Sequence, residues 1–442
     1  MTFSDEIFKA YDVRGVYPTE INEEAAKAIG LAVARLVGGG KVVVGRDMRL
    51  SSESLHQALI DGLIQGGINV YDIDLVPIDA VYFAVGNFGY DAGIMVTASH
   101  NPAEYNGFKV MRKNTQWVRG RELKDLIHIP PTKIEGGKLS ELDIWPTYLQ
   151  HVLSFVNPTD LKPLKIVVDA GNGMAGRAIP LLFKDLPFQV TSLFFELDGS
   201  FPNRPSNPLM SGASDAIVNK IREVKADIGI MFDGDTDRVF FLDENGIFVS
   251  ADVTLLLLAR EFLRREPGAT IAYNLICSHA VPELINKWGG KTIRTAVGYV
   301  NVSQALLHQG AVMGGELSAH YSFRDNYSTD SGMIAALLVL ELLSWQAKPL
   351  SKLVQEYSPY AKHPEINLKV VDKNKVLLGL KDHYKEGKID ELDGVTIEYT
   401  DWWANIRPSN TEPLLRLTIE AKDSELLALK KAEILDLIKS LS

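Results

Sequence analysis

The sequence has few of the features that mark secreted and membrane proteins. Its 442 residues include one cysteine, Cys277, which excludes an intrachain disulfide and fits a reducing compartment. The apolar neighbours of Cys277 predict a buried thiol. The longest apolar run, residues 333–340, is far shorter than the ~20 residues of a membrane-spanning helix. Acidic residues replace the positive charge that opens a signal peptide, so we expect a cytoplasmic protein with no membrane partner.

Clusters of lysine and arginine are also missing. The formal net charge is -10, so the sequence gives no reason to expect a nucleic-acid partner. Apolar residues make up 46% and charged residues 23%, which is the balance of a folded globular chain. Such an acidic chain can still bind phosphate, but only through a few placed arginines, lysines and backbone N–H groups.

Length and pattern predict three or four domains. Strands alternate with helical patterns through most of the chain, which indicates parallel βαβ units in three α/β blocks with a matching order of elements. Residues 128–145 form a turn-rich boundary, a second block starts near Leu164 and a third near Ala251. After Pro359 short alternating strands predict a small α+β domain. The predicted helices include 23–37, 330–345 and 424–440, and the predicted strands include 41–45, 70–73, 91–96, 164–168, 189–195, 228–232, 270–273, 367–371, 395–399 and 414–419.

A hydroxyl, an imidazole and an amide follow the predicted strand 91–96. Ser99, His100 and Asn101 stand directly before Pro102, which cannot donate a backbone hydrogen bond and disfavours helix in the preceding residue. The strand must therefore stop and turn here. A serine at such a tip suits a nucleophile or a phosphate carrier, although a loop serine that caps a turn has the same pattern.

Three aspartates follow the buried strand 228–232. Asp233, Asp235 and Asp237 alternate on a tight turn, where their oxygens can converge on a hard cation and would otherwise repel one another. A calcium EF-hand is a competing interpretation because Glu244 stands at loop position 12. Arg238 replaces the glycine that this loop needs and a strand follows, so Mg²⁺ fits better. Arg238 also suggests an anion that shares the site.

Gly171, Gly173 and Gly176 form a complete G-x-G-x-x-G pattern after a strand, and Glu196 or Asp198 ends the next strand. This spacing is a dinucleotide-binding fingerprint. A plain strand-to-helix turn that uses glycine for close packing fits the same residues.

Two further polar segments carry binding groups. Glu316, Ser318 and His320 alternate, so an extended backbone would turn all three side chains to one face, where they suit sugar hydroxyls. The segment from Arg407 to Pro413 joins two predicted strands and combines a guanidinium, hydroxyls and an amide, which can form a donor-rich cup for phosphate. An exposed polar loop and a Ser-Asn turn are the alternative interpretations.

Together these segments resemble the α-D-phosphohexomutases of the phosphomannomutase/phosphoglucomutase type over essentially the whole chain. Six motifs occur in the family's order, which makes the resemblance specific. They are Tyr11-Asp12-Val13-Arg14-Gly15, the Ser99 loop, Tyr105-Asn106-Gly107-Phe108-Lys109, the Asp233 loop, the Glu316 loop and the Arg407 loop.

The resemblance implies a four-domain, heart-shaped enzyme, in which three consecutive α/β domains with mixed, mainly parallel sheets precede a C-terminal α+β domain. The implied boundaries are 1–144 for the phosphoserine loop, 145–249 for the metal-binding loop, 250–360 for the sugar-binding loop and 361–442 for the phosphate-binding loop. The active cleft takes one loop from each domain.

The resemblance also implies roles for individual residues. Ser99 carries the phosphoryl group, whose oxygens hold one Mg²⁺ per chain together with Asp233, Asp235 and Asp237. Arg238 and Arg14 balance charge, while His100 and Lys109 are the proton-transfer candidates, with Lys109 favoured as the base. The sugar-binding residues are Tyr11, Glu316, Ser318 and His320, and the residues that hold the second phosphate are Arg407, Ser409, Asn410 and Thr411.

The implied reaction interconverts mannose 6-phosphate and mannose 1-phosphate, and also the glucose phosphates, through a hexose 1,6-bisphosphate that serves as activator. The segment 316–325 resembles bacterial phosphomannomutases of GDP-mannose supply. Phosphoglucosamine mutase and a dinucleotide-binding oxidoreductase are the alternatives. The expected partner is a small phosphosugar, and the expected assembly is a monomer or a weak homodimer.

One residue departs from the family pattern. Tyr299 stands where family members often carry a histidine in the loop that reads Val-Gly-His. A phenol can donate a hydrogen bond but carries no positive charge near pH 7. A contact from this loop to the sugar phosphate is therefore in question.

Overall fold

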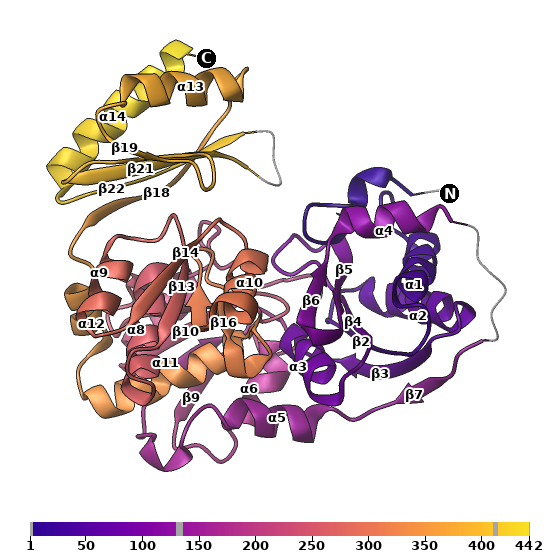
Figure 1. Cartoon of the computed structure of the whole chain (residues 1–442). Helices are drawn as coiled ribbons and strands as arrows, with labels where there is room; N and C mark the ends of the chain where they lie inside the picture. Colours follow the sequence, from indigo (N-terminus) through magenta and orange to yellow (C-terminus); the bar gives the residue numbers. More distant parts are fainter. Residues whose placement is uncertain (1–2, 130–135, 410–413, 442) are drawn as a thin grey trace.

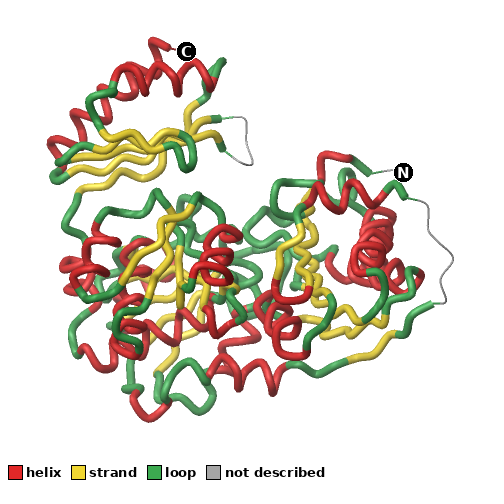
Figure 2. The backbone as a smooth tube through the Cα atoms, in the orientation of Figure 1, coloured by secondary structure: helices red, strands yellow, loops and turns green. Residues whose placement is uncertain are grey.

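The structure is a computed structural model that describes residues 3–129, 136–409 and 414–441. It contains four β-sheets in chain order, and each sheet carries its own helices (Figure 1; Figure 2). We number the four domains by these sheets. Three α/β domains followed by an α+β domain confirm the predicted four-domain α/β class.

The first domain has a seven-stranded mixed sheet in the order β1-β5-β4-β2-β3-β7, with β6 paired to β5. The strands β3, β2, β4 run parallel, and β5 runs antiparallel to both β4 and β1. Its elements are β1 (Val13–Val16), α1 (Glu23–Val37), β2 (Lys41–Arg46), α2 (Ser52–Gln65), β3 (Asn69–Leu75), α3 (Ile78–Phe88), β4 (Ala92–Val96), β5 (Tyr105–Arg112), β6 (Gln116–Val118), α4 (Gly120–Ile127) and β7 (Leu139–Glu141).

The second domain follows the helix α5 (Trp145–Leu153). Its sheet has the order β12-β11-β10-β8-β9, with β9, β8 and β10 parallel and the last two strands antiparallel. Its elements are β8 (Lys165–Asp169), α6 (Ala175–Leu182), β9 (Gln189–Leu193), α7 (Asp215–Val224), β10 (Ile228–Phe232), β11 (Val239–Leu242) and β12 (Phe248–Val249).

The third domain repeats this topology in the order β14-β13-β15-β16-β17. Its elements are α8 (Ala251–Arg265), β13 (Thr270–Asn274), α9 (Ala280–Lys287), β14 (Lys291–Thr295), α10 (Tyr299–Gln309), β15 (Ala311–Gly315), β16 (Tyr321–Phe323), β17 (Thr329–Asp330), α11 (Gly332–Gln346) and α12 (Leu350–Tyr357).

The repeated topology places three polar loops at equivalent positions. In each α/β domain the third parallel strand leads through one loop into an antiparallel fourth strand. These connections are β4 to β5, β10 to β11 and β15 to β16, and they contain Ser99, Asp233 and Glu316 respectively. The matching order of elements that the sequence predicted is therefore a matching strand order, and it brings the motifs to the same edge of each sheet.

The fourth domain is an antiparallel sheet in the order β18-β22-β21-β20-β19, with two helices on one face (Figure 1). Its elements are β18 (Ala361–Leu368), α13 (Lys373–His383), β19 (Lys388–Asp390), β20 (Val395–Glu398), β21 (Trp402–Pro408), β22 (Leu415–Ala421) and α14 (Ser424–Leu441).

The predicted strand 367–371 is wrong. The strand β18 begins six residues earlier and tolerates Pro364 at a register irregularity between His363 and Ile366. Proline removes a strand donor, so the sequence pattern places the strand after it. Val371 is 93% exposed, and the Asp372 carboxylate caps α13 by accepting from the Lys375 N–H. A second strand of this domain, β21, was not predicted from the sequence. It precedes β22, and the Arg407 segment joins the two.

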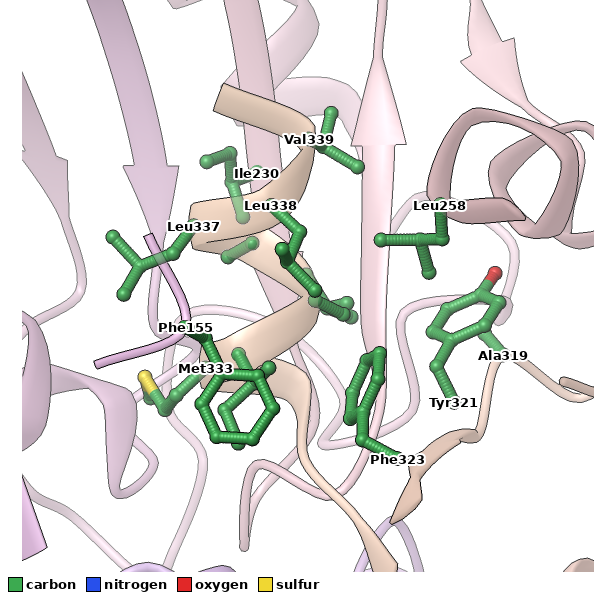
Figure 3. Packing of buried hydrophobic residues seen from close by; sticks show 14 of the residues in the cluster. Phe155, Ile230, Leu258, Ala319, Tyr321, Phe323, Met333, Leu337, Leu338 and Val339 are labelled. Carbon is green, nitrogen blue, oxygen red and sulfur yellow. The ribbon is translucent and has the colours of Figure 1, made fainter. Parts of the chain in front are cut away.

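The helix α11 forms the centre of the largest core cluster. It is apolar on all sides, and Phe155, Ile230, Leu258 and Tyr321 belong to the cluster packed around it (Figure 3). This cluster joins one face of the first sheet to the second and third domains, and the fourth domain has its own cluster. In the described part of the chain no single helix is long and apolar enough to cross a membrane, although α11 and α12 meet that composition together across a 98° bend.

Candidate active site

Most of the sequence-predicted residues of the first three domains line one cavity of about 1210 Å³, although Asp233 and Asp235 lie behind its wall. Its wall also includes a segment of the second domain and one arginine of the fourth. The predicted residues that line it are Tyr11, Arg14, Ser99, His100, Lys109, Asp237, Arg238, Glu316, Ser318 and His320.

Ser99 stands at the tip of the turn after β4. Its backbone is in the left-handed region at φ 50°, and its N–H donates to Thr97 Oγ1 at 2.9 Å. The Ser99 hydroxyl donates to Asp233 Oδ2 at 2.9 Å and lies 3.2 Å from His100 Nδ1. Burial, with Arg238 and Arg14 nearby, lowers the pKa of His100 well below its usual value. The imidazole is therefore neutral and can accept a proton.

Arg49 fixes this turn, and the sequence analysis missed it. Its guanidinium is 2% exposed and pairs with Asp47 at 3.3 Å. It donates at 2.7–2.9 Å to the backbone carbonyls of Ser99, Asn101, Pro102 and Tyr105. Ser206 of the second domain donates to the Ser99 carbonyl at 3.0 Å. The available signal was the position of Arg49 just after β2, because the carboxyl ends of the parallel strands β2 and β4 meet.

The three aspartates form a buried carboxylate cluster. Ligand oxygens of Asp233, Asp235 and Asp237 lie within 4.8 Å of one another. Burial and the neighbouring carboxylates raise the pKa of Asp233 well above its usual value and also raise that of Asp235. Burial acts the same way on Asp237, but Lys109, His320 and Arg238 outweigh it and lower that pKa. The cluster is thus short of positive charge.

The donor set of this cluster fits a divalent cation. The Oδ1 atoms of Asp235 and Asp237 are buried and have no hydrogen-bond partner among the residues that the structure describes. Carboxylate oxygens are the ligands that Mg²⁺ prefers. Glu244, the competing calcium ligand, instead accepts from the N–H and hydroxyl of Ser351 on α12. These observations favour the magnesium interpretation over the EF-hand.

Three cations surround the carboxylates. Lys109 donates to Asp235 Oδ2 at 3.1 Å and to Asp237 Oδ2 at 2.5 Å, and these carboxylates outweigh burial and raise the pKa of Lys109. Arg238 Nε lies 3.9 Å from Asp233 and 4.0 Å from Asp237. Arg14 donates to Asn101 Oδ1 at 2.6 Å beside the Ser99 turn.

The Glu316 segment is a tight turn and not an extended strand. Ala319 has φ 67°, the Ala319 N–H donates to the Glu316 carbonyl, and the Glu316 N–H donates to the His320 carbonyl. Glu316, Ser318 and His320 nevertheless all line the cavity. Glu316 accepts from the Gly298 N–H at 2.7 Å and from the Ser318 hydroxyl at 3.2 Å. The turn presents the predicted groups by a different backbone route.

The fourth domain brings an arginine that the sequence analysis did not name. Arg416 on β22 lines the cavity and stands directly opposite Arg407 on β21. Glu365 on β18 pairs with Arg407 at 2.7 Å and with Arg416 at 3.3 Å. Arg407 and Ser409 are not among the cavity-lining residues of the described chain, and the predicted Asn410 and Thr411 lie outside the described residues.

The glycine-rich turn after β8 is filled by the protein itself. The N–H groups of the turn donate to acceptors within the second domain at 2.8–2.9 Å. The Gly171 N–H donates to Asp169 Oδ1. The N–H groups of the next three residues donate to backbone carbonyls: Asn172 to Phe194, Gly173 to Ala170 and Met174 to Gly234. A side-chain carbon at Gly171 would meet the Arg204 guanidinium at 2.4 Å. The turn therefore offers no free donors for a pyrophosphate, which removes support for the dinucleotide interpretation.

Comparisons with known proteins agree with this geometry. Four phosphoglucomutase/phosphomannomutase family models match the chain: α/β/α domains I, II and III at residues 5–127, 146–246 and 250–360, and the C-terminal domain at 365–437. The chain is similar to proteins named "Phosphohexose mutases" from Xanthomonas campestris pv. campestris (38% identity, 98% of this chain, 99% of that protein) and "Phosphomannomutase" from Vibrio cholerae (38%, 98% and 98%).

A solved structure is also similar over almost the full length. It is a phosphoglucomutase/phosphomannomutase family protein from Burkholderia thailandensis, with a TM-score of 0.91, 33% identity, and coverage of 99% of this chain and 98% of that chain. The chain belongs to the phosphoglucomutase/phosphomannomutase family, and it is an enzyme of the mutase type that transfers phosphoryl groups.

Proposed function

We propose that this phosphohexomutase interconverts mannose 6-phosphate and mannose 1-phosphate, and also the glucose phosphates, with Ser99 as the phosphoryl carrier. The observation that carries the proposal is the position of Ser99, which lines a cavity large enough for a sugar bisphosphate and whose hydroxyl donates to Asp233, one of three converging carboxylates. Phosphoryl transfer depends mainly on alignment and on neutralisation of charge, and the site is built for both.

The first step forms a bond between phosphorus and the free hydroxyl oxygen of the hexose phosphate, while the bond from phosphorus to Ser99 Oγ breaks. The hydroxyl proton goes to a protein acceptor, and the Ser99 oxygen regains a proton. The hexose 1,6-bisphosphate then turns around, and the reverse chemistry returns its other phosphate to Ser99. The same bisphosphate, supplied from outside, would restore an unphosphorylated chain.

Two side chains are suited to the proton transfers. Lys109, which the resemblance favours as the base, is instead held charged by Asp235 and Asp237 and can donate a proton, whereas His100 is neutral, lies close to Ser99 Oγ and can accept one. Because the second half of the cycle is the reverse of the first, each residue serves as acid in one half and as base in the other. Arg14 and Arg238 offset the charge of the moving phosphoryl group.

Asp233, Asp235 and Asp237, with the oxygens of phosphorylated Ser99, would hold one Mg²⁺. The bound cation would neutralise the charge that develops on the transferring phosphoryl oxygens. The buried Asp235 and Asp237 oxygens without hydrogen-bond partners among the described residues support this assignment.

Sugar recognition would come from the Glu316 turn, with Tyr11 beside it. The ring nitrogens of His320, which was also predicted to bind the sugar, are instead bonded to Asp330 and Arg238. Glu316 and Ser318 offer an acceptor and a hydroxyl for sugar hydroxyls. Mannose and glucose differ only in the orientation of the C2 hydroxyl, which a site directed at other hydroxyls separates weakly. The names of the relatives, which include "Phosphomannomutase" and "Phosphomannomutase/phosphoglucomutase", support the order of preference.

The fourth domain would close over the bound substrate. Arg407 and Ser409, the described part of the phosphate cup, do not yet line the cavity, and this domain has a core of its own. Rotation of the domain would bring them to the phosphate that is not being transferred. Small-angle scattering should show compaction when bisphosphate binds, and an unchanged radius of gyration would contradict closure.

A coupled assay with Mg²⁺ and bisphosphate tests the function. We expect turnover of mannose 1-phosphate and glucose 1-phosphate and slower turnover of glucosamine 1-phosphate. No turnover of any of them would overturn the mutase proposal. A preference for the amino sugar would favour a phosphoglucosamine mutase.

The intact mass of the native chain should show one phosphate. Ser99→Ala should lose the phosphate and the activity, while Ser154→Ala, at an exposed serine just after α5, should keep both.

A further inference from the structure

Tyr299, the residue that departs from the family pattern, is held firmly in the cavity wall. It is the first residue of α10 and follows Gly298, whose φ of 127° suits glycine. Its ring stacks on His320 with centroids 5.4 Å apart and 26° between the planes. Trp117 meets it edge-on at 4.7 Å, and Tyr11 lies at 5.8 Å. Contacts from two domains therefore fix the direction in which the phenol points.

The Tyr299 hydroxyl is buried without a hydrogen-bond partner in the described chain, although the residue lines the cavity. Buried polar atoms nearly always have a partner, and a lone one costs free energy. Trp117 and Tyr11 pack against the ring of Tyr299 but give its hydroxyl no hydrogen bond. The arrangement is costly unless a group that enters the cavity supplies the missing acceptor.

His320 and Lys109, which lie near Tyr299, are already engaged in hydrogen bonds. His320 Nδ1 lies 2.5 Å from Asp330 Oδ2, and its Nε2 accepts from Arg238 at 2.9 Å, so both ring nitrogens are used. Lys109 donates to two carboxylates. The hydroxyl hydrogen of Tyr299 is thus available for an incoming ligand, whereas the imidazole on which it stacks is not.

The Tyr299 ring is linked through His320 to the charged groups around Ser99. Burial raises the pKa of Tyr299, and the carboxylates of Asp12, Asp330 and Asp237 raise it further against the opposing effect of Lys109. The phenol therefore keeps its proton. His320, on which the ring stacks, bonds the same Arg238 that faces Asp233 and Asp237.

We propose that the Tyr299 hydroxyl donates a hydrogen bond to an oxygen of the phosphoryl group as it passes between Ser99 and the sugar. The inference rests on the proposed function of Ser99 and adds a neutral donor to its charged partners. Such a donor stabilises the transferring group without adding a charge that would hold the bisphosphate in place. The missing positive charge at this position is then compatible with efficient transfer.

Tyr299→Phe tests the inference because it removes one oxygen and keeps the ring. The kcat should fall by about tenfold to a hundredfold, with KM within about threefold, because the bond forms mainly as charge moves. Single-turnover transfer from isotopically labelled phosphoserine to glucose 1-phosphate should slow by the same factor. The thermal midpoint should stay the same or rise, because the lost hydroxyl had no partner in the described chain.

Tyr384→Phe is the matched control. Its hydroxyl donates to Glu433 at 2.9 Å in the fourth domain, so its loss should lower the thermal midpoint and leave kcat unchanged. A Tyr299→Phe chain with native kcat, or one whose loss of activity follows loss of folded protein, would overturn the inference. If the native chain carries no phosphate on Ser99 and transfers none, the proposed function fails instead.

Discussion

The first three domains and the fourth are joined to the molecule in different ways. One buried apolar cluster runs through the first, second and third domains, with α11 at its centre (Figure 3). The fourth domain keeps a separate cluster and stands apart in Figure 1. Apolar packing resists relative motion because any shift opens cavities. The groups proposed for chemistry therefore lie on domains that share one core, and the proposed phosphate cup lies on a domain that we propose to be mobile.

Contacts to the fourth domain are mostly polar. The Val297 N–H donates to Asp393, the His279 N–H donates to Glu420, and Arg294 pairs with Asp390. Water can replace the exposed contacts among these at small cost. Glu420 is buried, and His279 also stacks on Trp403 at 5.1 Å. Lys362, which is partly buried, pairs with the buried Asp252 at 2.5 Å where β18 begins. That pair marks the point about which the domain could turn.

Asp235→Asn, in the first three domains, should reduce the activity most strongly. It keeps the shape of the side chain but removes a carboxylate that faces Lys109 and accepts from Thr97. We expect kcat to fall about a thousandfold and the Mg²⁺ concentration for half-maximal activity to rise.

Binding of a phosphosugar through the fourth domain should change little in this variant, which calorimetry can measure. Asp227→Asn is the control, because that carboxylate accepts from the Lys165 N–H in the same domain. Activity above a tenth of the native value would contradict the assignment of Asp235.

Arg49→Met should have the next largest effect. The change leaves Asp47 buried without its ion pair and removes the guanidinium that donates to the carbonyls of the Ser99 turn. Loss of one partner of a buried ion pair costs about 3–5 kcal/mol. Hydrogen exchange read by mass spectrometry should show the loss of protection in the first three domains and not in the fourth. Equal loss everywhere would mean that the four domains unfold together.

Arg49 also shows where sequence reasoning stops. Ser99 and Asp233 were predictable because polar residues directly after an apolar strand are a local pattern. The partners that hold the Ser99 turn come from the loop after β2 and from Ser206 in another domain, so they appear only once the sheets are assembled. The order of helices and strands was predictable for the same local reason.

The missed features have equally specific causes. The strand predicted at 367–371 starts too late because Pro364, inside β18, is a residue type that usually marks a loop. The Glu316 turn was predicted as extended because an alanine in the left-handed region, here Ala319, is rare and has no sequence signature. Arg416 was missed because its significance comes from its position opposite Arg407 on the neighbouring strand.

The pH dependence of unfolding tests how much Asp79 stabilises the packing of the first three domains. This buried carboxyl on α3 accepts from Tyr148 of α5 at 2.8 Å and from Ser331 at the start of α11. Burial raises its pKa to about 7. The folded chain therefore keeps a proton that the unfolded chain loses near pH 4, so stability should fall as pH rises from about 4 to about 7.

Asp79→Asn should remove this dependence. The native chain should lose about 1 kcal/mol relative to the variant for each pH unit between 5 and 7, measured by urea unfolding of the first three domains. Above pH 7 the difference should level off. Parallel pH profiles for the two chains would show that Asp79 titrates in its ordinary range.

Glu365→Gln should give the smallest change in activity, and it tests how the fourth domain binds phosphate. Arg407 and Arg416 face each other on adjacent strands, where like charges repel, and Glu365 bonds both. The carboxylate stabilises the empty cup but competes with a phosphate for the same guanidinium groups. Its removal should lower KM for the phosphosugar about twofold to fivefold, in line with a partly exposed ion pair, and leave phosphorylation of Ser99 unchanged. Asp401→Asn, which removes the exposed partner of Lys422, should leave KM unaltered. A higher KM in the Glu365 variant would mean that the carboxylate mainly aligns the arginines, so that phosphate affinity in the mobile domain depends on geometry more than on net charge.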